Sequence, residues 1–376
     1  MDERKRRLRV GDWVEVRSKE EILRSLDRNG EYEGMPFMPE MLSFCGQQFK
    51  VYKRAHKTCD TVFPVRGRRV PGSVHLETRC DGESHGGCQA GCLIFWKEAW
   101  LRRLTAANAN EALRRSAEEQ AHTGQATPRF SERDLHRCTV RKSDAGVEDV
   151  YVCQATRLPY ATTHLWWWDA RQYVEDYTSG NVTLLRLLTG FTFAAYSTVL
   201  NAGIGLGPPL RWIYNRLRPL WHGSMYPGMT GWIAAGSKTP SASLDLRPGE
   251  WVRVKRHEEI LATLDIRSKN KGLLWDKEMV PYCGGTYRVL RRVTRIIDEK
   301  TGLMRDMKSP CIVLDKVICT GRYSKRRLFC PRSISPYFRE IWLERVSEPE
   351  LPVSAVPCCT AKDGDRWDAG DVTMRR

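Results

Sequence analysis

The sequence predicts an α+β protein in which two copies of one small β-rich domain flank a mixed middle region with one long apolar helix. Three observations predict this fold class. Residues 11–54 return as residues 249–292, short segments of both copies alternate apolar and charged side chains, and residues 187–210 carry no charge. A chain of 376 residues is long enough for two or three domains, each with its own core.

The duplication is the strongest of these signals. A constant offset of 238 positions aligns residues 11–54 with 249–292 without a gap. GDWVEV matches GEWVRV, EEIL matches EEIL, and Glu40-Met41 matches Glu278-Met279. After short insertions, Trp100-Leu101 matches Trp342-Leu343. The period is too long for a solenoid unit, so it indicates two copies of a small domain.

Each copy predicts a similar order of elements. It opens with an alternating strand, residues 12–17 or 250–255, whose apolar and charged side chains point to opposite faces. Residues 19–27 then predict one or two helical turns, and 36–41 predict another. The further strands expected are 49–54, 75–80 and 93–104 in copy one, and 287–293, 311–319 and 337–346 in copy two. About five short strands in a domain of this size predict a small barrel or sandwich.

The opening segments GDWVEV and GEWVRV, with strongly bent strands after them, resemble SH3-like small barrels of the KOW type. The resemblance rests on about a dozen residues in each copy and implies an SH3-like β-barrel for both. The helical insert after the first strand departs from the plain SH3 pattern. No functional residue is carried over from that family.

These patterns divide the chain into six parts. Copy one, with a cysteine cluster, spans 1–104, and the basic copy two spans 247–346. The remaining parts are a helix and linker (105–134), a middle region with a hairpin and aromatic and apolar helices (135–235), a linker (236–246) and a disordered tail (347–376).

The cysteine cluster of copy one predicts a metal site. Its candidate ligands are Cys59, Cys80, His85, Cys88 and Cys92. Four thiolates suit tetrahedral zinc or an iron–sulfur cluster, and His85 could replace Cys59 as a zinc ligand. Zinc is therefore the expected cofactor, with an iron–sulfur cluster as the alternative. Free cysteines buried in a β core are the structural interpretation of the same pattern.

Copy two keeps only part of this set. Cys319 and Cys330 align with Cys80 and Cys88, but Ile334 stands where copy one has Cys92. A purely structural metal should keep its ligands in both copies. Copy one therefore holds a functional metal, or the shared cysteines are core residues.

The middle region holds the most aromatic and the most apolar segments. Trp166, Trp167 and Trp168 predict a ligand or membrane-interface surface, or rings packed beneath a helix. Residues 187–210 are long enough to span a bilayer, although several glycines and Pro208-Pro209 weaken them as an isolated helix. A buried helix and membrane contact through 187–221 are both open.

The net charge of +16 and the pI near 9.4 favour an anionic partner, either nucleic acid or another polyanion. Copy two contributes most of the surplus, with 23 Lys and Arg against 12 Asp and Glu in residues 247–346. The candidate anion-binding residues are Arg288, Arg291, Arg292, Arg295, Arg322, Lys325, Arg326 and Arg327. The alternative is a solvated charged face.

Sequence motifs do not identify a reaction. The chain has no GxSxG, phosphate-loop, HExxH or strand-linked GxGxxG motif, so whether it is an enzyme stays open. The favoured function is a non-enzymatic binding or assembly protein. The alternatives are an iron–sulfur or zinc metalloenzyme or redox protein, and a membrane-associated accessory protein. An odd cysteine count and no secretory signal predict the cytoplasm, with membrane association as the alternative. The oligomeric state is not predicted.

Overall fold

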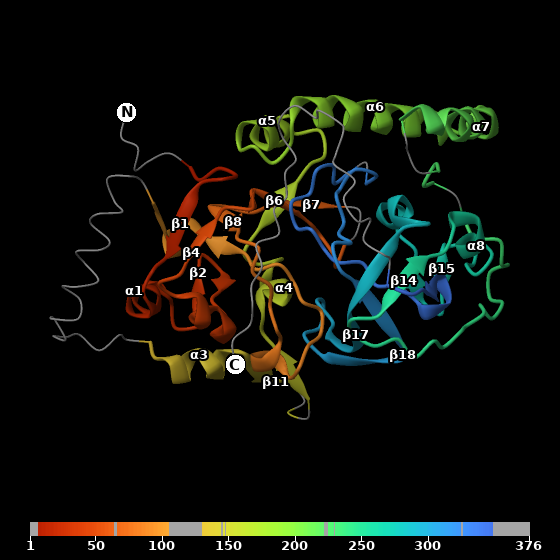
Figure 1. Ribbon diagram of the computed structural model, residues 1–376. Helices are drawn as coiled ribbons and strands as arrows, with labels where there is room; N and C mark the ends of the chain where they lie inside the picture. The colour runs from red at the N-terminus through yellow and green to blue at the C-terminus, as the bar shows by residue number, and fades with distance from the viewer. Residues whose placement is uncertain are drawn as a thin grey trace.

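The computed structural model describes residues 7–63, 66–104, 130–143, 146, 148–221, 225–228, 230–324 and 326–348. Helices and several small antiparallel sheets make up an α+β fold, which confirms the predicted class (Figure 1). Of the helix and linker expected over 105–134, residues 105–129 lie outside the described residues, as does the expected tail from 349 onwards.

Copy one and copy two of the duplicated sequence are called repeat one and repeat two in the structure. Repeat one is organised around its opening strand. β1 (Trp13–Val16) pairs antiparallel with β10 (Leu101–Arg103) on one side and β4 (Gln48–Lys50) on the other. The helix α1 (Lys19–Ser25) follows, because Ser18 and Glu21 form a capping box at its start. The second predicted helical turn is the 3₁₀ helix η2 (Pro39–Phe44).

Three small sheets complete repeat one. The first pairs β2 (Glu31–Tyr32) with β3 (Met35–Pro36), and the second contains β5 (Lys53–Arg54), β8 (Ser73–His75) and β9 (Trp96–Lys97). The third contains β6 (Lys57–Cys59) and β7 (Gly67–Arg69), with β13 (Thr163–Leu165) of the middle region at its edge. The strand expected over 75–80 is wrong after His75, because residues 76–92 form a tight loop around the 3₁₀ helix η3 (Glu83–His85).

Repeat two is built in the same order. β14 (Trp251–Val254) pairs with β17 (Thr286–Ile297) and β19 (Leu343–Arg345), and β18 (Met304–Leu314) extends the sheet. The other elements of this repeat are α8 (His257–Leu261), β15 (Lys269–Asn270), β16 (Leu273–Leu274), η6 (Lys277–Tyr282) and η7 (Glu340–Trp342). The counterpart of η7 in repeat one is η4 (Glu98–Trp100).

An arginine–glutamate pair occurs at the same place in both repeats. Arg54 binds Glu98 and donates to the carbonyl of Leu8. Arg292 likewise binds Glu340, at 2.7 Å, and donates to the carbonyl of Leu246. Each pair lies beside a separate hydrophobic core that contains one fully buried tryptophan of the duplicated Trp-Leu motif.

The middle region packs along both repeats. Its elements are α3 (Glu132–Cys138), the predicted hairpin of β11 (Val140–Lys142) and β12 (Asp149–Tyr151), α4 (Gln154–Arg157), α5 (Arg171–Thr178), α6 (Leu184–Leu200), α7 (Gly207–Leu217) and η5 (Arg218–Trp221). In Figure 1, α5, α6 and α7 lie in a row along one edge of the molecule.

The single long apolar helix predicted over 187–210 is wrong. α6 ends at Leu200, and α7 begins at Gly207. The intervening turn contains Gly203 and Gly205 with left-handed φ of 77° and 80°, a conformation that interrupts a right-handed helix. No helix in the described ranges has the length and apolar composition needed to cross a bilayer.

Candidate metal centre

The loop after β8 is wound tightly by two glycines. Gly82 and Gly86 flank η3 with left-handed φ of 80° and 62°. A Cβ at Gly82 would overlap the carbonyl of Cys88, and one at Gly86 would overlap the ring of Tyr151. The loop therefore needs glycine at both positions, and its winding brings His85 back towards Cys80.

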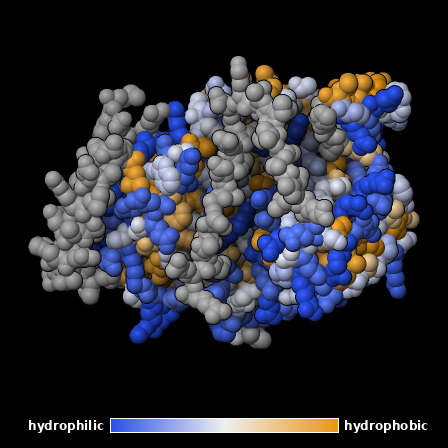
Figure 2. Space-filling model, in the orientation of Figure 1, coloured by the Kyte–Doolittle hydropathy of each residue, from blue (hydrophilic) through white to orange (hydrophobic). Residues whose placement is uncertain are grey.

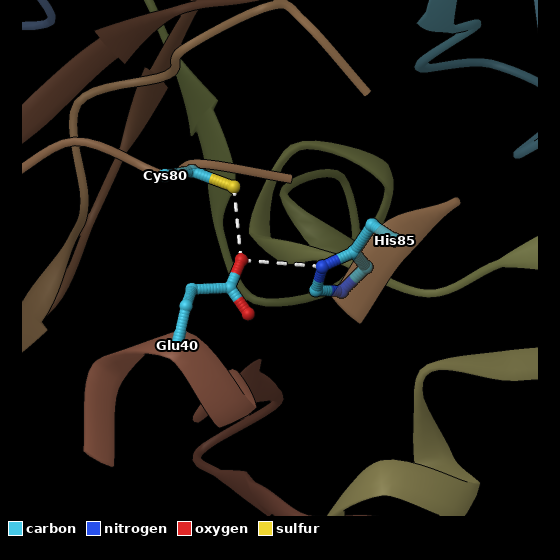
Figure 3. Close-up of side chains that lie close together, drawn as sticks. All are labelled: Glu40, Cys80 and His85. Carbon is cyan, nitrogen blue, oxygen red and sulfur yellow. Dashed lines mark hydrogen bonds and ion pairs between the residues drawn. The ribbon is translucent and has the colours of Figure 1, made fainter. Parts of the chain in front are cut away.

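Three side chains converge where this loop meets η2 (Figure 3). Cys80 Sγ lies 2.9 Å and His85 Nδ1 lies 3.2 Å from the same oxygen, Oε1 of Glu40. The three ligand atoms lie within 4.8 Å of one another, and among the described residues this is the one such group with three potential metal ligands. Tetrahedral zinc with bonds of about 2.0–2.3 Å holds its ligands roughly 3.5 Å apart, so these side chains are nearly in place.

The hydrogen bond of His85 orients its ring as in a metal ligand. Nε2 lies 3.1 Å from the carbonyl oxygen of Val152, so this nitrogen carries a proton and donates it. Nδ1 then faces the carboxylate of Glu40, 3.2 Å from Oε1. Two electron-rich atoms facing each other need a proton or a cation between them. Metal-bound histidines commonly use this arrangement, with the second nitrogen donating to a carbonyl.

The carboxylate of Glu40 is buried and incompletely paired. Its side chain is 4% exposed, and Oε2 has no hydrogen-bond partner among the described residues. Burial raises the pKa of Glu40, but the hydrogen bond and charge of His85, with the hydrogen bond of Cys80, outweigh burial and lower it. Burial and the neighbouring Glu40 raise the pKa of Cys80. Without a cation, the site therefore holds an ionised carboxylate beside a protonated thiol.

A cavity of about 40 Å³ adjoins Cys80 and His85. This volume exceeds the roughly 10–15 Å³ that one water molecule needs. Its lining includes Cys80, His85, Cys88, Cys92 and Cys153, together with apolar side chains. Burial raises the pKa of Cys92 to about 12 and that of Cys153 to about 11.

The structure separates the five predicted ligands. Cys80 and His85 belong to the centre, and Cys88 and Cys92 line the cavity beside it. Cys59 lies elsewhere, where its backbone amide donates to Cys330 Sγ at 3.2 Å. The hydrogen bond from Cys330 lowers the pKa of Cys59 to about 6. The four sulfurs predicted for an iron–sulfur cluster are therefore not gathered around one point.

Repeat two fills the corresponding position differently. Glu278, the counterpart of Glu40, accepts hydrogen bonds from the backbone amides of Thr320, Arg322 and Tyr323 and from the Thr320 hydroxyl. Four donors satisfy this carboxylate. The same buried acid thus anchors a loop in repeat two, whereas in repeat one it meets a thiol and an imidazole.

Sequence reasoning missed Glu40. The duplication already contained the signal, since Glu40-Met41 and Glu278-Met279 match in register. An acid repeated beside a buried methionine indicates a carboxylate that turns inwards. Acids are also common in the first turn of a helix, so the repeated acid alone does not identify a ligand.

The candidate anion-binding residues do not form one free basic face. Arg292 is paired with Glu340, Arg295 with Asp306 at 2.9 Å, and the Arg291 guanidinium lies against Gly91 of repeat one. The others in the described ranges are Arg288, Arg322 and Arg326, which are exposed, and Arg327, which is half-buried. Lys325 lies outside the described residues.

A groove of about 780 Å³ does combine cations with aromatic rings. Its lining includes Arg66, Arg326 and the three consecutive tryptophans 166–168. All three tryptophans are about half exposed, so they are not packed beneath a helix. The rings of Trp166 and Trp168 stack on each other with centroids 4.5 Å apart.

Comparison with known proteins finds no relative: no protein-family model, curated protein or solved structure matches the chain significantly. Function is therefore inferred from the geometry of these sites.

Proposed function

We propose that this chain is a non-enzymatic binding protein whose first repeat holds one zinc ion between Glu40, Cys80 and His85. The observation that carries the proposal is the buried carboxylate of Glu40, which lies beside Nδ1 of His85 and the thiol of Cys80 and keeps one oxygen without a hydrogen-bond partner among the described residues. A mixed oxygen, sulfur and nitrogen ligand set suits zinc. Binding would release the thiol proton of Cys80, because the thiolate is the ligand.

The position of the centre suggests a structural role for the ion. His85 is bonded to Val152 of the middle region. Further along the same loop, Gln89 accepts from the amide of Thr294, and Cys88 accepts from the amide of Ile297, both in repeat two. An ion that fixes this loop would fix the contact between the two repeats.

A zinc metalloenzyme is the rival function, and the adjoining cavity favours it. Three protein ligands beside open space are typical of catalytic zinc, whereas structural zinc has four protein ligands. Cys92 and Cys153 line that cavity and are the candidates for a fourth ligand. Their contribution therefore separates the two functions.

Elemental analysis of anaerobically purified protein tests the proposal. We expect one zinc per chain in the natural protein and in the control variant Cys138→Ser, and large losses in Glu40→Gln, Cys80→Ser and His85→Gln. Loss of zinc in Cys92→Ser or Cys153→Ser would indicate a closed structural site. Full zinc in both would favour the enzyme. Protein without metal that binds no added zinc would refute both, and iron with brown colour would indicate a cluster instead.

A second binding function is favoured by the tryptophan groove. Exposed rings at the edge of a basic groove provide stacking platforms for bases and cations for phosphates, so we propose single-stranded nucleic acid as the anionic partner. Arg66 and Arg326 are exposed at this groove, whereas Arg68 is held by Thr162 and Asp60. The partner thus contacts residues of both repeats and of the middle region.

Binding of an oligothymidine tests this function. We expect Trp166→Ala with Trp168→Ala to weaken binding by about tenfold or more, and Arg326→Ser to reduce its salt dependence. Trp232→Ala is the matched control, because Trp232 is also largely exposed but lies away from the groove lining. Equal losses in the control, or no binding by the natural protein at low salt, would refute it.

The SH3-like barrel is also a proposal for each repeat. It is supported by the opening strands β1 and β14, each paired on both sides with a later strand and with the closing strand of its repeat. An experimental structure in which the closing strands fail to complete a barrel would refute it.

A further inference from the structure

We propose that the outer face of α6 and α7 lies on the surface of an anionic lipid bilayer. The region defined by these helices and the turn between them exposes many large apolar side chains. They are Leu184, Leu185, Leu188, Phe191, Val199, Ile204, Leu206, Trp212, Ile213 and Leu217. Figure 2 shows hydrophobic colouring at the edge of the molecule where Figure 1 places these helices.

The opposite face of α6 fixes this orientation. Leu187, Gly190, Ser197 and Leu200 are buried at helical spacing. Gly190 lies so close to Phe329 of repeat two that a Cβ would overlap the ring. Ser197 bonds to the hydroxyl of Tyr226 at 3.1 Å. The apolar outer face is therefore held outwards by packing on the inner face and is not available to the protein's own core.

The exposed threonine hydroxyls of α6 are satisfied within the helix. Thr192 and Thr198 donate to the carbonyls of Leu188 and Ala194, four residues earlier, at 2.9 and 2.7 Å. Hydroxyls bonded in this way do not need water. The face can therefore leave water for the interfacial region of a bilayer without losing hydrogen bonds.

Charge selects the partner. The chain has no acidic residue between Asp176 and Asp245, while Arg186, Arg211, Arg216 and Arg218 all fall in that interval. Arg216 is exposed, Arg211 and Arg218 are half-buried, and Arg186 donates to the carbonyl of Thr320 in repeat two. An apolar face that contains tryptophan, flanked by arginines and free of acids, is typical of helices lying in the interface of anionic membranes. A protein partner would require no such one-signed charge, whereas anionic lipid headgroups match it.

The mode of attachment follows from the helix lengths. α6 has 17 residues and α7 has 11, and a turn separates them. With no bilayer-crossing helix in the described ranges, the two helices would lie parallel to the surface. The other described residues would remain on one side of the bilayer.

Flotation of the full-length protein with vesicles tests this proposal. The vesicles contain phosphatidylcholine alone or phosphatidylcholine mixed with phosphatidylserine. We expect binding to the mixed vesicles at low salt, weaker binding to phosphatidylcholine alone, and about fivefold weaker binding in Arg216→Ser. The triple variant Leu185→Ser, Leu188→Ser, Trp212→Ser should weaken binding by at least about tenfold.

The matched control is Ile266→Ser with Leu290→Ser. These side chains are 52% and 46% exposed and lie in repeat two, so their loss should leave vesicle binding unchanged. Circular dichroism establishes that each variant is folded. No binding by the natural protein, or equal loss in the control, would overturn the proposal. So would a dimer in solution that the triple variant dissociates while vesicle binding persists, because the face would then belong to a second copy.

Discussion

Glu40 and Glu278 occupy equivalent positions of the two repeats but have opposite hydrogen-bonding environments. Glu278 accepts from four donors in the loop that follows Cys319, whereas Glu40 is met by one thiol and one imidazole and keeps Oε2 unpaired among the described residues. Duplication thus preserved the acid and changed what surrounds it. The same acid is a structural anchor in one copy and a candidate metal ligand in the other.

This difference predicts that replacement by glutamine destabilises the protein more at position 278 than at position 40. Glu278→Gln replaces an acceptor with an NH₂ group that faces N–H donors, so we expect a loss of about 2–4 kcal/mol in the free energy of unfolding. Glu40→Gln should cost the metal-free protein less, because fewer donors lose their acceptor. Urea denaturation of both variants without metal provides the comparison. A larger loss for Glu40→Gln would contradict the assignment.

The free energy of unfolding at acid pH should depend on the ionisation of Glu40. The pKa of Glu40 is lowered in the folded protein from its ordinary value of 4.5. A carboxylate with a lowered pKa contributes stability above its unfolded pKa and loses that contribution as the pH falls through the folded pKa. The stability difference between the metal-free natural protein and Glu40→Gln should therefore shrink below about pH 4.5. Denaturant unfolding at several pH values between neutral and acid measures this stability difference. A difference that grows as the pH falls would contradict the prediction.

Replacing Gly82 should affect stability and zinc binding much more than replacing Gly87 in the same loop. Gly82→Ala places a Cβ on the carbonyl of Cys88, in addition to the cost of a left-handed φ of 80°. We expect it to cost about 3 kcal/mol or more and to abolish zinc binding.

The control is Gly87→Ala, whose φ of 74° is also left-handed but whose Cβ would meet open space. It should cost only about 1–2 kcal/mol and retain zinc. Thermal unfolding and metal content measured on the same samples test both variants. Similar losses of stability and zinc in the two would show that close packing at Gly82 is not what the loop requires.

The duplicated arginine–glutamate pairs should differ in how much they stabilise the protein. Arg54 is 4% exposed and binds both Glu98 and Glu175, so Arg54→Ala removes the buried cation that joins these two half-buried acids and should cost about 3–5 kcal/mol. Arg292 is 27% exposed, and Arg292→Ala should cost about 1–2 kcal/mol. Guanidinium denaturation gives both values. An equal or larger effect at Arg292 would show that burial does not set the difference.

The sequence alone determined the local features. Alternation of apolar and charged side chains located β1 and β14, and the acids and apolar spacing after them located α1 and α8. These features depend on neighbours within a few residues. The duplication is also visible in the sequence alone, because residues match at one constant offset, and the matches include Glu40 and Glu278.

Tertiary structure decided which side chains meet. Cys59 and Cys80 belong to one sequence cluster, yet β6 carries Cys59 to Cys330 of the other repeat, while η2 brings Glu40 to Cys80. Ligand spacing along the chain does not determine spacing in space when long loops intervene. The same applies to α6 and α7, since composition marked residues 187–210 as apolar, but only packing against Phe329 and Tyr226 determined which face remains outside.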